Sequence, residues 1–165
     1  MMHRPWIRVA TLSVATLALV TACSKKPKEA TDTANRSGFD EGRSSSEGVG
    51  PQRHPDLRTV YFDYDSSAIR GDQRATLKNN ADAIARRTEW RTITVEGHTD
   101  ERGTEEYNLA LGDRRAAAAK QYLENLGVSS SKLVTVSLGE SQPAVAGHDE
   151  SAWSKNRRAE FLYSR

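Results

Sequence analysis

The chain has 165 residues, enough for one domain with terminal tails. Its 24 Lys and Arg against 22 Asp and Glu give a net charge of +2, and the excess comes from the first 22 residues, which hold two Arg and no acid. The remainder is formally neutral, so net charge gives no support for a nucleic-acid partner, which requires a basic face.

Residues 1–22 are predicted to be a signal peptide. Arg4 and Arg8 form its charged start, and residues 9–19 are its apolar part. The 14 residues between Arg8 and Cys23 are too few for a membrane-spanning helix, which needs roughly 20. An ordinary secretory signal cleaved after Ala22 would leave Cys23 as an unexplained free thiol.

The segment Val20-Thr21-Ala22-Cys23 resembles a bacterial lipobox. That resemblance implies a diacylglycerol on the Cys23 thiol and cleavage that leaves Cys23 as the acylated N-terminus, with palmitate-type chains anchoring the protein. Two or more acyl chains make such attachment stable. Ser24, in place of Asp, implies the outer membrane as the destination, with the folded domain in the periplasm.

Residues 23–56 are predicted to be the lipidated cysteine followed by a disordered tether. The segment is rich in Ser, Gly, Lys, Glu and Pro and has almost no aliphatic residues, so it cannot bury enough apolar surface to offset the entropy of ordering. As a flexible coil it would span roughly 30 Å. Whether it does more than span a distance stays open.

Residues 57–165 are predicted to form the folded domain, which begins with a strand over residues 58–63 and a helix over residues 72–88. Val60 and Phe62 alternate with Tyr61 and Asp63 in the strand. The helix has an apolar stripe formed by Leu77, Ala81, Ile84 and Ala85.

A second strand over residues 91–97 leads into a long helix that runs to about Leu126. Thr104 is the expected N-cap, and Gly127 the expected residue just past the helix end. Gly112 inside the helix costs about 1 kcal/mol relative to Ala, and a close approach of helix and strand is the expected compensation. The residues expected to face the sheet are Ala116, Ala119, Leu123 and Leu126.

Two further strands, over residues 133–138 and 159–163, flank a loop over 141–153 with at most one short helical turn. The predicted fold class is therefore α/β, a two-layer sandwich in which a mixed four-stranded sheet carries two main helices on one face in the order βαβαββ.

Residues 96–116, EGHTDERGTEEYNLALGDRRA, bring opposite charges to one place. Asp100 lies in the turn before the long helix, and Asn108, Leu111 and Arg115 share one stripe of that helix. An Asp accepts an ammonium group, and an Arg binds a carboxylate through two parallel hydrogen bonds. The pair therefore suits a small zwitterionic ligand.

This stretch resembles the core motif of the OmpA-like peptidoglycan-binding domain family, and its DERG segment is most similar to the peptidoglycan-associated lipoprotein branch. The resemblance covers residues 60–163 and implies an OmpA C-terminal-like fold. It also implies that Asp100 and Arg115, with Asn108 alongside, grip the meso-diaminopimelate of the cell-wall peptide.

The same resemblance implies the biological setting. The protein would link the outer membrane to the wall as part of the Tol-Pal system, which serves envelope integrity and cell division. TolB and other Tol components are the implied protein partners.

Further site residues are expected beside the diaminopimelate position. Thr99 and Leu111 are predicted to line the pocket, although Leu111 suits a core position equally well. The family resemblance places Asp65 in contact with the ligand and Asp63 in the same loop, where the backbone is expected to matter more than the side chains. Simple turn chemistry is the alternative for both.

Asn156, Arg157 and Arg158 match the closing motif of the family. One of the two arginines is expected to be structural and to pair with a carboxylate such as Glu96. His98 and His148 lack metal-ligand spacing, so no metal site and no cofactor are predicted.

An enzyme is the rival hypothesis. The segment Asp63-Tyr64-Asp65-Ser66-Ser67 resembles the start of aspartate-nucleophile, Mg²⁺-dependent phosphatases. Such enzymes need a larger domain with a later acidic pair at a strand end, which this sequence lacks. The predicted function is therefore binding, with no catalytic residue.

Overall fold

Residues 50–165 are described by a computed structural model. They form five strands, three α-helices and two short 3-10 helices, here given in chain order: β1 (Gln52–Arg53), β2 (Val60–Tyr61), η1 (Gly71–Gln73), α1 (Arg74–Arg86), β3 (Thr92–His98), α2 (Glu105–Asn125), η2 (Ser130–Lys132), β4 (Leu133–Gly139), α3 (Glu150–Asn156) and β5 (Arg158–Ser164).

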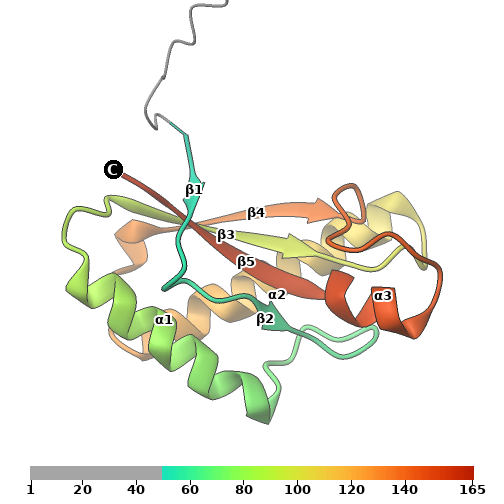
Figure 1. The fold of residues 1–165 in the computed structure, drawn as a ribbon, viewed down its shortest axis with the longest axis horizontal. Helices are drawn as coiled ribbons and strands as arrows, with labels where there is room; N and C mark the ends of the chain where they lie inside the picture. The colour runs from blue at the N-terminus through green and yellow to red at the C-terminus, as the bar shows by residue number, and fades with distance from the viewer. Residues whose placement is uncertain (1–49) are drawn as a thin grey trace, which may run out of the picture. The chain divides into compact units, whose positions relative to one another are not determined.

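The strands form one mixed sheet with the order β1-β5-β3-β4, and β2 also pairs with β5 (Figure 1). β3 and β4 are parallel and are connected through α2, whereas β5 runs antiparallel to its neighbours β1, β2 and β3. The predicted α/β class with a mixed sheet is confirmed.

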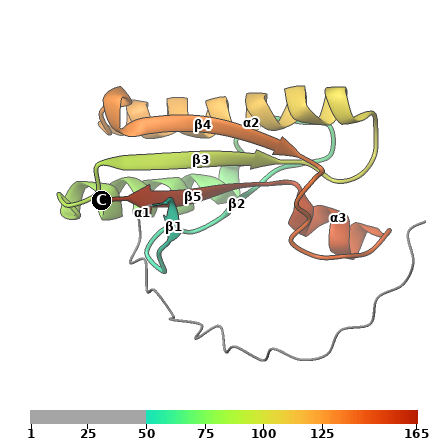
Figure 2. The same ribbon diagram turned by 90° about the horizontal axis from the view of Figure 1, so that it is seen from above.

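The two longer helices form the second layer on one face of the sheet, and α3 lies at the end where β5 begins (Figure 2). Ile93 and Val95 of β3 are fully buried beneath this layer, together with Ala119 and Leu123 of α2. Alternation along β3 therefore places Glu96 and His98 on the opposite face of the sheet.

Two glycines allow α2 to pack directly on β3, as expected from the glycine inside the helix. A Cβ added at Gly97 would lie 1.9 Å from the carbonyl oxygen of Gly112, and one at Gly112 would lie 2.4 Å from Oγ of Ser137. The backbones of helix and strand thus meet where any larger residue would force them apart.

The ends of α2 follow the predicted capping. Thr104 accepts a hydrogen bond from the backbone N–H of Tyr107, and Gly127 has φ +94° just past the last turn. The N–H groups of Gly127 and Val128 donate to the carbonyls of Glu124 and Leu123. This is the Schellman arrangement, which satisfies carbonyls that the helix end leaves free.

Several predicted details of the helices are wrong. Ala85 is exposed and Ala83 is buried in its place. Leu126 lies past the end of α2 and is 41% exposed. The predicted loop before the last strand contains α3, whose N-cap Asp149 accepts from the N–H of Ala152.

The strands at the start of the domain also differ from the prediction. The strand expected over residues 58–63 shortens to β2, because the chain leaves the sheet after Tyr61 to form the loop of the site described below. β1 lies inside the segment predicted to be disordered tether, since Gln52 and Arg53 pair with Tyr163 and Leu162 of β5. Order therefore begins before residue 57.

The predicted signal peptide, Cys23 and the tether up to residue 49 lie outside the described residues. None of the helices within residues 50–165 has the length and apolar character needed to cross a membrane.

Candidate functional site

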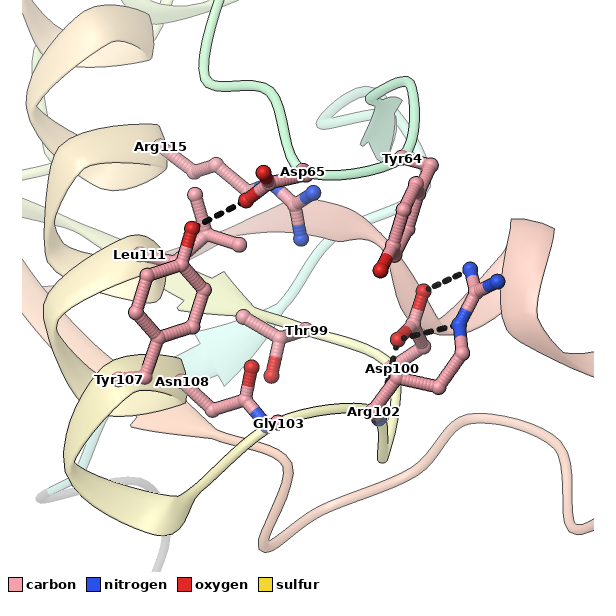
Figure 3. Close-up of a pocket in the computed structure, with 10 residues that line it drawn as sticks. All are labelled: Tyr64, Asp65, Thr99, Asp100, Arg102, Gly103, Tyr107, Asn108, Leu111 and Arg115. Carbon is pink, nitrogen blue, oxygen red and sulfur yellow. Dashed lines mark hydrogen bonds and ion pairs between the residues drawn. The ribbon is translucent and has the colours of Figure 1, made fainter.

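A pocket of about 210 Å³ opens where β3 ends and α2 begins, opposite the loop that follows β2. Its lining comes from these three segments (Figure 3): Tyr64, Asp65, Thr99, Asp100, Arg102, Gly103, Tyr107, Asn108, Leu111 and Arg115. The loop before α2 thus faces the first turns of the helix across a polar cavity.

Asp100 is buried and accepts four hydrogen bonds. Arg102 donates three of them, through its backbone N–H at 3.2 Å, Nε at 3.2 Å and Nη2 at 2.8 Å, and Nη1 of Arg157 donates the fourth at 3.3 Å. Burial opposes ionisation, but these donors outweigh it and hold the pKa of Asp100 below its ordinary value. The carboxylate is therefore charged at neutral pH, and its oxygens already accept hydrogen bonds from Arg102 and Arg157.

Arg102 is held in place by two aromatic rings as well as by Asp100. Its guanidinium carbon lies 3.9 Å from the ring centre of Tyr64 and 4.1 Å from that of Trp153. Stacking on aromatic faces suits a guanidinium because its charge is delocalised and weakly hydrated. Arg102 thus forms a cationic cover over Asp100 at the rim of the pocket (Figure 3).

Arg115 is buried on α2 and donates to three backbone carbonyls. Nε reaches Ser66 at 2.8 Å, Nη1 reaches His98 at 2.8 Å, and Nη2 reaches Asp63 at 3.0 Å. Burial, only partly offset by Asp100, lowers the pKa of Arg115 to about 10, so the side chain remains cationic at neutral pH. Because a guanidinium has five N–H groups, one hydrogen on each terminal nitrogen is left for a ligand.

The remaining polar lining differs in how its side chains are paired. Asn108 donates through Nδ2 to Glu140, and the hydroxyl of Tyr107 donates to Asp65. Asp65 has φ +50°, a left-handed conformation that Asp tolerates better than most residues. Oγ1 of Thr99 is buried at the pocket and has no hydrogen-bond partner among the described residues.

The sequence of this chain is similar to those of known proteins. A sequence model of the OmpA family matches residues 61–157. The peptidoglycan-associated lipoprotein of Haemophilus influenzae is 44% identical, over 92% of this chain and 95% of its own length. The protein of the same name from Pseudomonas aeruginosa is 37% identical, over 93% of this chain and 95% of its own length.

The chain belongs to the OmpA family. Solved structures agree with this assignment. The crystal structure of the peptidoglycan-associated lipoprotein from Burkholderia pseudomallei has a TM-score of 0.62 and 45% identity, covering 65% of this chain and 90% of that one. The C-terminal domain of Helicobacter pylori MotB has a TM-score of 0.61 and 25% identity, covering 66% and 84%.

The fold of this OmpA-family domain brings most of the sequence-predicted site residues into one pocket. Six of the seven contribute to the lining: Asp100, Arg115, Asn108, Asp65, Thr99 and Leu111. The seventh, Asp63, does not, because its side chain is 70% exposed and forms an ion pair with Arg70. Its backbone carbonyl instead accepts from Arg115. Leu111 is 5% exposed, so it serves both the core and the pocket.

Three lining residues were not predicted from the sequence: Arg102, Gly103 and Tyr107. Tyr64 lies in the loop that was expected beside the ligand, but its backbone and not its side chain was expected to matter. Arg102 and Gly103 lie inside the DERG segment that carried the family resemblance. That they line the pocket was not predicted, because the neighbouring sequence does not indicate that the Arg102 side chain folds back onto Asp100. Tyr107 precedes Asn108 on the helix, and its hydroxyl donates a hydrogen bond to Asp65 on the opposite side of the pocket.

Both arginines of the closing motif are buried and pair with carboxylates, as expected for a structural role, although the partner is not Glu96 in either case. Arg157 contacts Asp100 and Glu150. Arg158 donates to Glu160 two residues further along β5, with an Nε–Oε1 distance of 2.5 Å. Neighbouring residues of extended chain point in opposite directions. The side chain of Arg157, just before β5, therefore contacts Asp100 of the pocket, whereas that of Arg158 contacts Glu160 on the other face of the sheet.

The relatives are named for association with peptidoglycan and not for a catalysed reaction, in agreement with the prediction that this domain is not an enzyme. The geometry also disfavours the phosphatase alternative, since the side chain of Asp63, its required nucleophile, points away from the pocket.

Proposed function

We propose that this domain binds peptidoglycan non-covalently by holding the free end of a meso-diaminopimelate residue in the pocket. The observation that carries the proposal is the presence of a buried carboxylate and a buried guanidinium in the lining of one cavity. A diaminopimelate end carries both an ammonium and a carboxylate, so Asp100 and Arg115 complement it in charge.

The roles of the remaining groups follow from their donors and acceptors. Arg115 offers the two hydrogens not used by carbonyls to the ligand carboxylate, and Asn108 and Thr99 offer polar atoms beside it. The ligand ammonium takes the place of the Arg102 side chain on Asp100. The aliphatic side chain of Leu111 borders the methylene chain of the ligand.

The decisive test is a pull-down with isolated sacculi, using the chain from Ser24 to Arg165, which omits the lipidated cysteine. Asp100→Ala and Arg115→Ala are each expected to lower binding at least tenfold, since loss of one member of a buried charge pair costs about 2–5 kcal/mol. The matched controls Asp113→Asn on α2 and Arg74→Gln on α1 change the same residue types at exposed positions outside the pocket lining and are expected to bind like wild type.

The fold of each variant should be checked by circular dichroism, because Arg115 also holds three backbone carbonyls. Asp100→Asn adds a variant that keeps the shape of the side chain. Folded Asp100 and Arg115 variants that retain wild-type binding would refute the assignment. Equal binding to a lysine-type wall, whose stem lacks the second carboxylate, would contradict the role of Arg115.

We further propose that lipid on Cys23 anchors the protein in the outer membrane. Support comes from the lipobox-like sequence and from the lipoprotein names of the full-length relatives. Mass spectrometry of the processed N-terminus is expected to find diacylglycerol on Cys23. Recovery of Cys23→Ala with the outer membrane, in the same amount as wild type, would count against the anchor.

The family resemblance also supports a place in the Tol-Pal system, with TolB as the partner on the face that holds the pocket. Tyr64 and Tyr107 are 59% and 44% exposed at the rim, and Tyr is enriched at protein interfaces. Purified TolB is expected to compete with a diaminopimelate peptide. Simultaneous binding of both without loss of affinity would argue against a shared face.

A further inference from the structure

A second cluster of polar side chains lies on the sheet face opposite the helices and is not used by the pocket. Glu96 and His98 of β3 and Glu160 of β5 each present a possible metal-ligand atom, and these three atoms lie within 4.8 Å of one another. Glu96 and Glu160 are direct cross-strand partners in the β3–β5 register. The three side chains thus converge from two adjacent strands.

His98 gives this cluster an unusual property. Its side chain is 1% exposed, and neither ring nitrogen has a hydrogen-bond partner among the described residues. Nε2 lies 3.8 Å from Oε2 of Glu96, too far for a hydrogen bond. Buried polar atoms are rarely left without a partner, because desolvation is costly.

Two arginines accompany the two carboxylates of the cluster, and both of them contact Glu160. Like charges directly opposite each other on neighbouring strands are destabilising, and Glu96 and Glu160 are such a pair. Arg158 donates to Oε1 of Glu160 and to the carbonyls of Asn156 and Gln142, which fixes it in place. Arg53 contacts Oε2 of Glu160 as an ion pair outside hydrogen-bonding geometry, and its side chain is 74% exposed.

We propose that Glu96, His98 and Glu160 form a binding site for a divalent first-row transition-metal ion, with Zn²⁺ as the best match. The ion takes Nε2 of His98, one oxygen of Glu96 and Oε2 of Glu160, and the exposed Arg53 swings away while Arg158 keeps Oε1. Water completes the coordination. One imidazole with two carboxylates suits Zn²⁺, whereas Ca²⁺ prefers six to eight oxygen ligands.

Metal binding requires the three ligand atoms, which lie within 4.8 Å of one another, to move closer together. A tetrahedral site with bonds of about 2.0 Å places its ligand atoms about 3.3 Å apart. The separation of 3.8 Å between His98 and Glu96 closes to that value by side-chain rotation. The sequence shows no metal motif because the third ligand, Glu160, comes from the last strand. It lies next to Glu96 and His98 only in the folded sheet.

The test is isothermal titration calorimetry of the chain from Ser24 to Arg165 with Zn²⁺, since omission of Cys23 removes the one thiol. One Zn²⁺ per chain is expected. Glu96→Gln should weaken binding at least tenfold, because loss even of a group that only supports a ligand costs about 10–100-fold in affinity. This variant should fold, since the Glu96 side chain is 19% exposed and forms no hydrogen bond with any residue of the described range 50–165.

Two comparisons separate the site from surface histidines. Arg53→Ala removes the competing guanidinium and should strengthen Zn²⁺ binding severalfold. His148→Asn, which alters the exposed pair with Glu101, should leave it unchanged. Absence of Zn²⁺ binding, retention in Glu96→Gln, loss in His148→Asn or equal affinity for Ca²⁺ would each overturn the proposal. None of these measurements involves peptidoglycan, so the result is independent of the proposed wall binding.

Discussion

The two charged residues of the pocket are prepared for a ligand in different ways. Arg115 is fixed by three backbone carbonyls and retains two free N–H groups. Asp100 has all its acceptor positions filled, three of them by Arg102. A ligand carboxylate therefore meets a preformed donor, whereas a ligand ammonium must displace a cation that is already bound.

This difference predicts a gain of affinity at the residue scale. Arg102→Ala should tighten binding of a diaminopimelate peptide, because the ammonium no longer competes with the guanidinium for Asp100. Arg102 is 30% exposed and Asp100 is 5% exposed, so this ion pair is partly buried. The gain should therefore exceed the roughly fivefold change that corresponds to the upper limit of about 1 kcal/mol for a fully exposed pair.

Fluorescence titration of the purified chain with the peptide would measure this change. Arg74→Ala provides the control, since Arg74 is exposed at the start of α1 and does not line the pocket. Weaker binding by Arg102→Ala would show that Arg102 itself holds the ligand and that the displacement idea is wrong.

At the scale of elements, the position of the site depends on how closely α2 approaches β3. Asp100 follows β3 and Arg115 lies on α2, so their separation depends on the packing of these two elements. The approach is set by Gly97 and Gly112, whose backbones are in contact. The cost of a glycine inside a helix is therefore offset by the geometry that it allows.

The contact predicts a graded loss of stability. Gly97→Ala should lower the free energy of unfolding by at least about 2 kcal/mol, because its new Cβ would meet a backbone oxygen that cannot rotate away. Gly112→Ala should cost less, since its new Cβ would meet the backbone oxygen of Gly97 at 2.8 Å and not at 1.9 Å, the closer contact being to the side-chain oxygen of Ser137, and since Ala favours the helix by about 1 kcal/mol.

Urea unfolding followed by circular dichroism would measure both changes. Gly71→Ala is the matched control, since a Cβ there meets nothing within 4 Å and the substitution should be neutral or slightly stabilising. If Gly97→Ala had the same free energy of unfolding as wild type, the close contact between Gly97 and the backbone of Gly112 would be excluded.

At the scale of the whole molecule, the start of the ordered domain covers one end of the core. His54 packs edge-on against Trp90 and Tyr163, with ring centres 5.0 and 5.7 Å apart. Trp90 is only 1% exposed, and β1 pairs with β5 beside this group. The N-terminal segment of the domain is therefore held by a short strand and by the aromatic contacts of His54.

Removal of this segment should destabilise the domain. A chain starting at residue 57 is expected to be less stable than one starting at residue 43 by about 2–4 kcal/mol, because it loses two aromatic contacts and the β1–β5 hydrogen bonds. The chain starting at residue 43 contains every residue that the structure describes and is a suitable reference.

Thermal unfolding of the two chains would measure the difference, and a third chain starting at residue 50 provides the control, since it retains β1 and His54. The third chain should match the reference. Equal melting temperatures for all three would mean that β1 and His54 contribute nothing to the fold.

The sequence by itself determined the features that depend on local patterns. Alternating apolar residues indicated β3 and β4, the Thr104 and Gly127 signals indicated both ends of α2, and the spacing of Asn108, Leu111 and Arg115 placed them on one stripe. These signals are local because hydrogen bonding and periodic burial act over a few residues. Asp100 and Arg115 could be singled out as opposite charges in one stretch, but the family resemblance, and not local periodicity, indicated their role.

Only the tertiary structure decided which distant groups meet. The occupation of Asp100 by Arg102 and Arg157, the partner of Arg158, the pairing of β1 with β5 and the convergence of Glu96, His98 and Glu160 all depend on the order and register of the strands. Side-chain contacts across a sheet join residues that are far apart in the chain, and no local periodicity encodes them. Electrostatic pairing in particular is settled by burial and distance, which exist only once the chain has folded.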